Sequence, residues 1–264
     1  MRPPASEDVC GGASPLVIEL CGLPGAGKTT VAHALVAQLR EQGCPAHVVD
    51  DDVSAAVPRT RRVQRKLKLL ASVLAIDPLG EARAARLLGR GQRSRRDMLA
   101  VPVQWWVAER LLSDARCRTG VSIVEEGLVQ ALWSAGLRSG ATTVPDLVAL
   151  AESAVRPDLV VHLDVPVELA LSRLRSRGSR HSRVQRLTPG AQLATMREGD
   201  LLLRGLLAEW TRRGFGEVTV ARVPASGPYA VDSGARDLDV VHQEAHRTGG
   251  GGAADDVEVQ GRAG

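Results

Sequence analysis

The chain has 264 residues, a length that suits one large domain or two small ones. Hydrophobic residues make up 44% and charged residues 24%, which is ordinary for a globular protein and excludes a wholly disordered chain. The formal net charge is +4, and only three of the 34 basic residues are lysine. Nucleic-acid binders, phosphate binders and other arginine-rich proteins all share so small an excess, so charge does not decide between them.

Several features favour a cytoplasmic protein with a single folded domain. No apolar stretch reaches the 18 or so residues of a membrane span, and residues 1–12 lack the apolar segment of a secretory signal. Residues 1–14 and the glycine-rich residues 247–264 are predicted to be disordered tails around one domain at 15–246. Neither CxxC nor zinc-type spacing occurs, so reduced thiols are expected at Cys10, Cys21, Cys44 and Cys117.

Short β-prone runs alternate with longer helical patterns, which predicts an α/β fold with a doubly wound, five-stranded parallel sheet. The runs are mostly apolar, with single interruptions such as Glu19 and His162. Strands of this kind are covered by helices on both faces of the sheet. The five predicted strands are residues 16–21, 46–49, 121–124, 159–163 and 218–221.

A long interval separates the second and third predicted strands. It holds two helical patterns, at residues 60–88 and 96–118, and therefore predicts a helical cap over about 53–119. Trp105 and Trp106 lie in the second helix, and a tryptophan there could stack on a base. Adjacent helical residues diverge by about 100°, so at most one of them faces a pocket, and core packing is favoured for both.

The clearest motif directly follows the first strand. Gly22-Leu-Pro-Gly-Ala-Gly-Lys-Thr29 matches GxxxxGK[ST] between a strand and a helix, and the scarcity of lysine makes a chance match improbable. Glycines let backbone N–H groups surround a phosphate, Lys28 reaches the β and γ phosphates, and the Thr29 hydroxyl binds Mg²⁺. The motif therefore predicts ATP and Mg²⁺ as cofactors, bound by Gly22, Leu23, Pro24, Gly25, Ala26, Gly27, Lys28, Thr29 and Thr30.

Three aspartates follow the second strand, at an edge where ligands bind in doubly wound sheets. Strand residues alternate in direction, so Asp50 and Asp52 could point together while Asp51 points away. Such a pair could accept a proton from a substrate hydroxyl, and we treat both residues as catalytic candidates. The alternative is a solvated acidic turn or a helix N-cap.

Acidic residues also end the third and fourth strands. Glu125 and Glu126 close the third, in a position suited to holding Mg²⁺, and Asp164 closes the fourth. A Val-Pro pair after Asp164 starts a helix, so this residue is explained equally well as a cap. We favour Glu125 as the catalytic acid that shares the metal with Thr29, with Glu126 as the alternative.

Arginines gather beyond the fourth strand. A helix is predicted over 167–177, then a polar loop, then a helix over 190–213, and we take residues 173–190 as an arginine-rich lid. Guanidinium groups there could bind phosphate oxygens and stabilise the transition state of phosphoryl transfer. We expect Arg173 and Arg177 to be catalytic and Arg180 to bind ATP, all on one helix face if the helix persists. Arginine is common throughout the chain, which is the simpler explanation.

Together these residues resemble the P-loop kinase group that includes the thymidylate kinases and deoxynucleoside kinases. Residues 157–178 (PDLVVHLDVPVELALSRLRSRG) are similar to that group's segment entering the lid, with Arg173 and Arg177 in its RxxxR positions. The resemblance implies a sheet order of 2-3-1-4-5, ATP on the P-loop and an acceptor under the cap. Thymidylate kinases carry a DRY-like triplet where this chain has Glu125-Glu126-Gly127, so the resemblance does not extend to thymidylate as acceptor.

We therefore expect an ATP-dependent small-molecule kinase that moves the γ-phosphoryl group to a nucleoside, a nucleotide or another hydroxylated small molecule. Gln104 or Arg96 in the cap could read the edge of a base. The alternative is a P-loop ATPase or regulatory NTP-binding protein without a small acceptor, which the long cap and the lid disfavour. Expected partners are ATP and the acceptor, with no membrane. Nucleic acid is disfavoured because the basic residues 59–68 are explained by a solvated helix face; a homodimer is left open.

Overall fold

The computed structural model of the protein describes residues 15–49, 64, 78–92, 94–139, 142–177 and 183–222. Both predicted tails, the first part of the predicted cap and the centre of the predicted lid lie outside these residues. Among the described helices, none is both long enough and apolar enough to cross a membrane.

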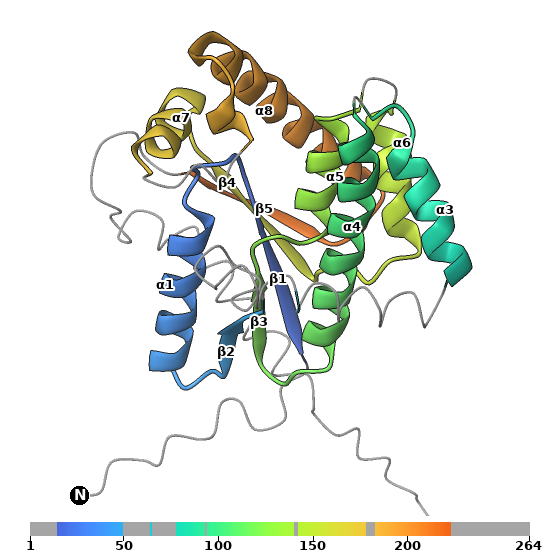
Figure 1. Ribbon diagram of the computed structural model, residues 1–264. Helices are drawn as coiled ribbons and strands as arrows, with labels where there is room; N and C mark the ends of the chain where they lie inside the picture. The colour runs from blue at the N-terminus through green and yellow to red at the C-terminus, as the bar shows by residue number, and fades with distance from the viewer. Residues whose placement is uncertain are drawn as a thin grey trace, which may run out of the picture.

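Five parallel strands form one sheet in the order β2-β3-β1-β4-β5, which confirms the expected order (Figure 1). Each pair of neighbours is parallel, so all five carboxyl ends lie at one edge of the sheet. The observed bounds differ from the predicted ones by one residue or less. The strands are β1 (Leu16–Cys21), β2 (Ala46–Val48), β3 (Val121–Val124), β4 (Leu159–Asp164) and β5 (Glu217–Arg222).

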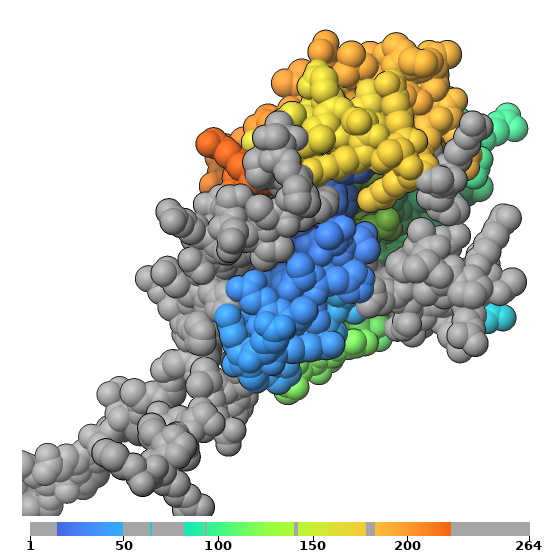
Figure 2. All heavy atoms as spheres, turned by 90° about the vertical axis from the view of Figure 1, so that its left-hand side faces the viewer, coloured from blue at the N-terminus to red at the C-terminus, as the bar shows by residue number. Residues whose placement is uncertain are grey.

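Helices cover both faces of the sheet, as the continuous apolar strands predict. Figure 1 shows α1 on one side of the central strands and α4 and α5 on the other. Every residue of β1 and β3 is buried, which explains why neither strand alternates between apolar and polar residues. In the view of Figure 2, α7 (yellow) lies above α1 (blue), with α8 (orange) at the top.

The helices agree with the predicted ones where both can be compared. α4 and α8 begin one residue before their predicted starts, and α3 is the described part of the pattern at 60–88. The helices are α1 (Lys28–Glu41), α3 (Pro78–Gly89), α4 (Arg95–Arg116), α5 (Leu128–Gly136), α6 (Val144–Ala149), α7 (Val167–Ser176) and α8 (Pro189–Arg212), with short 3₁₀ turns η2 (Leu150–Glu152) and η3 (Val184–Arg186).

The sequence patterns do not predict α5 or α6. All but one of the nine residues of α5 are buried, so this helix lacks the contrast between apolar and polar faces from which amphipathic helices are recognised. α6 has six residues, too few to show a helical period. Both helices lie between β3 and β4, and α5 forms one wall of the site described below.

A tight turn before β3 gives a stability prediction. Gly120 has φ +83°, and a Cβ atom there would lie 2.2 Å from the Pro45 carbonyl oxygen, which accepts the hydrogen bond of the Val121 amide. Gly43 has a similar φ of +81° with open space around it. We expect Gly43→Ala to lower the free energy of unfolding by about 1 kcal/mol through backbone strain. Gly120→Ala should lower it by about 1–2 kcal/mol more, because the added Cβ also meets the Pro45 carbonyl oxygen. Urea unfolding measures both, and equal costs would show that the close approach does not matter.

Candidate active site

The loop between β1 and α1 has the backbone that its glycines allow. Gly25 and Gly27 have φ values of +91° and +96°, in the left-handed region that favours glycine. A Cβ atom on Gly25 would lie 2.1 Å from the Ala170 carbonyl oxygen, so the loop packs directly against α7. Glycine at position 25, which is a variable position of the motif, is therefore required here both by conformation and by space.

Lys28 is the first residue of α1 and lies at the mouth of the loop. Its Nζ donates a hydrogen bond to the Gly22 carbonyl oxygen at 3.0 Å. Burial lowers the pKa of Lys28, whereas the nearby carboxylates of Glu126 and Glu125 act in the opposite direction. The ammonium group is thus held at the helix N-terminus, where a phosphate would be bound.

Thr29 and Glu125 are in direct contact. The Thr29 hydroxyl donates a hydrogen bond of 2.6 Å to Glu125 Oε2, although the two residues come from α1 and from the end of β3. Glu125 is buried, and this burial raises the pKa of its carboxyl group, while Thr29 and Lys28 act to lower it. Asp164, the competing acid, is paired instead with Arg204 at 2.7 Å and does not line the site.

The Thr29–Glu125 pair suits Mg²⁺ better than a metal caged by protein ligands. Mg²⁺ in phosphate-handling sites uses one or two carboxylates or hydroxyls and completes its shell with phosphate and water oxygens. Among the described residues, no group of three or more His, Cys, Asp or Glu side chains is arranged to hold a metal. One carboxylate with one hydroxyl is a donor set that fits a metal delivered with ATP.

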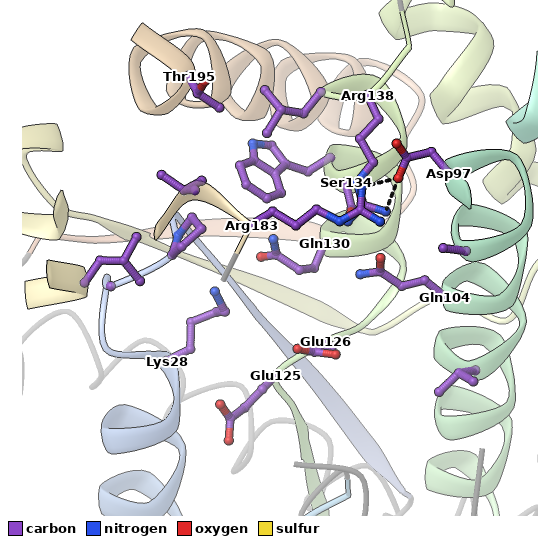
Figure 3. Close-up of a pocket in the computed structure, with 18 of the residues that line it drawn as sticks. Lys28, Asp97, Gln104, Glu125, Glu126, Gln130, Ser134, Arg138, Arg183 and Thr195 are labelled. Carbon is purple, nitrogen blue, oxygen red and sulfur yellow. Dashed lines mark hydrogen bonds and ion pairs between the residues drawn. The ribbon is translucent and has the colours of Figure 1, made fainter. Parts of the chain in front are cut away.

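A cavity of about 1140 Å³ extends from this loop to α4 and α5 (Figure 3). Pro24, Gly25, Gly27, Lys28 and Thr29 line it from the loop. Polar side chains from the two helices line it further along, among them Gln104 on α4 and Gln130 and Ser134 on α5. The volume is at the upper end for small-molecule sites, so the cavity has room beyond the phosphate-binding loop.

A buried carboxylate connects the loop to α5. Glu19 lies in the middle of β1 with 0% of its surface exposed, and its Oε1 accepts a 3.0 Å hydrogen bond from the Gln130 backbone amide in the first turn of α5. A Cβ on Gly127 would lie 2.4 Å from this carboxylate. The Gln130 side chain in turn accepts from the Gly22 amide at 3.4 Å. The start of the loop and the start of α5 are therefore held in fixed positions relative to each other.

An ionic cluster that the sequence does not reveal lies on the α4–α5 side of the cavity. Arg183 forms an ion pair and hydrogen bond with Asp97 Oδ1, and Arg138 Nη1 lies 3.9 Å from the same oxygen. Ser94 donates a 2.6 Å hydrogen bond to the other oxygen of Asp97. Burial by itself would raise the pKa of Asp97, but Ser94 and Arg183 together lower it below the ordinary value.

The lid arginines are separated in the structure. α7 ends at Ser176, and Arg177 has an extended backbone with ψ 126°. The helix therefore does not persist, and the condition under which Arg173 and Arg177 would share a helix face is not met. Arg177 lines the cavity and Arg173 does not. Arg180 lies outside the described residues, as do Asp50 and Asp52, so their predicted roles stay predictions.

The tryptophans of α4 are not part of the site. Trp105 is buried in the core, Trp106 packs against the core, and neither lines the cavity. Gln104 and Arg96, the polar residues predicted to face a ligand, do line it. Core packing therefore accounts for both tryptophans, as the sequence analysis predicts.

Comparison with known proteins agrees with the geometry. The profile of a family described as AAA domain matches residues 17–199. A thymidylate kinase of Alkalilimnicola ehrlichii is 29% identical over 177 residues, which cover 66% of this chain and 72% of that protein. Two structures of deoxyadenosine kinase from M. mycoides also match, one with bound dATP and one with dCMP and dCDP. Each is 14% identical in sequence to this chain with a TM-score of 0.45, and the match covers 87% of this chain and 98% of the kinase. The family match and the similarity to a thymidylate kinase confirm the expected resemblance to the P-loop kinase group.

The burial of Glu125 predicts how Mg²⁺ binding depends on pH. The raised pKa keeps Glu125 protonated to pH values above the ordinary 4.5, so acidification should weaken Mg²⁺-dependent ATP binding earlier than an ordinary glutamate would. We expect Glu125→Gln to weaken the apparent Mg²⁺ affinity about tenfold or more and to remove this part of the pH dependence.

The measurement is binding of a fluorescent ATP analogue across Mg²⁺ concentration and pH. The protonation of the ATP analogue affects the unchanged protein and Glu125→Gln equally, so it cancels when the pH profile of one is subtracted from that of the other. Glu126→Gln, at the exposed neighbouring position, is the control and should have a smaller effect. A larger effect of Glu126→Gln would reverse the assignment of the two acids.

Proposed function

The chain belongs to the AAA-domain family of P-loop proteins, and from that premise we propose that it is an ATP- and Mg²⁺-dependent kinase of a small hydroxylated molecule. One observation carries the proposal: the P-loop and a polar surface on α4 and α5 line the same cavity. A protein that only hydrolyses ATP needs the first surface but not the second. The similarity to a thymidylate kinase supports a nucleoside or nucleotide as the acceptor within this class.

On the ATP side, the backbone amides of the loop and the N-terminus of α1 bind the phosphates, and Lys28 adds a compact positive charge. Thr29 and Glu125 would hold Mg²⁺, which when bound neutralises charge between the β- and γ-phosphates. Arg177 lines the cavity, and its guanidinium group would bind oxygens of the transferring phosphoryl group. Of Arg173 and Arg177, the two arginines predicted to be catalytic, Arg177 is therefore the one that we assign to transition-state stabilisation.

On the acceptor side, the amide side chains of Gln104 and Gln130 can orient a ligand through both donor and acceptor atoms. Trp133, Val103 and other apolar side chains on the same wall supply contact area and keep water from the reacting group. The hydroxyl that receives the phosphoryl group lies toward Lys28 in this arrangement. Asp50 or Asp52 remains the predicted proton acceptor.

The proposal predicts transfer of labelled γ-phosphate from ATP to a member of a pooled library of nucleosides, nucleotides and sugars. Transfer should need Mg²⁺, and Lys28→Ala should lower it about 100-fold or more while leaving the unfolding midpoint nearly unchanged, because Lys28 binds phosphate and contributes little to the core. ATP binding without labelling of any acceptor, together with DNA-stimulated hydrolysis, would favour the ATPase alternative.

Arg177 gives a second prediction with a matched control on the same segment. Arg177→Gln should lower the turnover number about tenfold or more with little change in ATP affinity, because its charge is needed when the γ-phosphoryl group moves. Arg186→Gln removes the same charge from an exposed residue of η3 that does not line the cavity. Steady-state kinetics of the two variants should differ, and equal turnover would remove Arg177 from the mechanism.

A further inference from the structure

Two arginines share one carboxylate in the wall of the cavity. Arg138 follows α5, Arg183 precedes η3, and Asp97 lies in the first turn of α4. Both guanidinium groups approach Asp97 Oδ1, and Figure 3 shows them converging on Asp97 from different elements. Three side chains thus carry two positive charges and one negative charge.

The surplus positive charge is poorly compensated by the protein. Within the described part of the chain, Asp97 is the only carboxylate within 4.0 Å of Arg138, and at 3.9 Å it is beyond hydrogen-bond distance. The side chain of Arg138 is only 22% exposed, so water compensates it in part. Burial and the proximity of Arg183 both lower the pKa of Arg138, which is the direction expected for a cation in an unfavourable environment.

The cluster also differs from a simple structural ion pair. A structural pair is balanced, one charge against one, because an unmatched buried charge destabilises the fold. Here the second arginine adds a half-buried cation that Arg183 and Asp97 do not need. Its guanidinium has five N–H donors arranged to bind the oxygens of a carboxylate or phosphate.

We propose that Arg138 and Arg183 bind a negatively charged group of the acceptor, a carboxylate or a phosphate, and that Asp97 holds the two arginines in place until the acceptor binds. This rests on the proposed function and specifies its substrate class. The acceptor then carries a hydroxyl that lies toward Lys28 and an anionic group that lies against Arg138 and Arg183. The P-loop remains the site for the phosphates of ATP, so the two anion sites have separate roles.

The test compares acceptors that differ in one anionic group: thymidine 3′-monophosphate with thymidine, gluconate with glucose, and glycerate with glycerol. We expect the charged member of at least one pair to be phosphorylated with a kcat/KM at least about tenfold higher than its neutral partner. Arg138→Gln and Arg183→Gln should each remove that preference by raising KM for the charged member alone. Phosphorylation of neutral members only, or equal losses for both members, would overturn the proposal.

The variant Asp97→Asn distinguishes acceptor binding by the two arginines from a purely structural role of the cluster. Asparagine retains an oxygen that can accept the hydrogen bond from Ser94 but no longer competes for the arginines, so KM for the charged member should fall. If the cluster only ties η3 to α4, the same variant should instead raise KM for both members. Arg186→Gln, which removes one charge outside the cavity, should change neither value.

A binding measurement keeps the test independent of catalysis. With the P-loop filled by Mg²⁺ and a non-hydrolysable ATP analogue, sodium phosphate or acetate should raise the thermal unfolding midpoint more than sodium chloride at equal ionic strength. Arg138→Gln should abolish this difference and Arg186→Gln should retain it. Protection without transfer to any acceptor would leave the anion site intact and contradict the kinase proposal, whereas transfer without protection would contradict the anion site.

Discussion

The buried carboxylate of Glu19 is the constraint on which the arrangement of the site depends. A carboxyl group inside a central strand is costly unless hydrogen bonds replace the lost water. Here the amide of Gln130 and the positive end of the α5 dipole provide part of that compensation, at Oε1. There is no space for a side chain at Gly127, so the start of α5 packs directly against Glu19 on β1. The residues that join β3 to α5, including Glu125, are therefore held beside the P-loop.

This one interaction joins three parts of the cavity that are distant in sequence. The P-loop follows β1, the acid of the proposed metal pair follows β3, and the wall proposed for the second ligand is α5 itself. The Gln130 side chain strengthens the connection through its contact with the Gly22 amide. A site assembled in this way needs little rearrangement when ligands bind, which is the condition under which electrostatic contacts are most effective.

The sequence predicts what is encoded locally. The five strands and the P-loop were recognisable because continuous apolar runs and a strict motif are short-range signals. α5 was not, since burial on all sides removes the helical period, and Glu19 is recognisable only as an interruption of a strand. The Asp97 cluster could not be predicted either, because its members come from three separate elements and arginine is frequent everywhere in the chain. The arrangement of Arg173 and Arg177 differs from the predicted one because α7 ends at Ser176, one residue before its predicted end.

The contact of Gly25 with α7 limits which side chains this loop can carry. Gly25 has no space for a side chain, and among the variable letters of the motif Leu23 and Ala26 are buried in the core. Only Pro24 is partly exposed and lines the cavity. Within this loop, position 24 is therefore the variable position of the motif at which a different side chain could change the contacts with a nucleotide without disturbing the core.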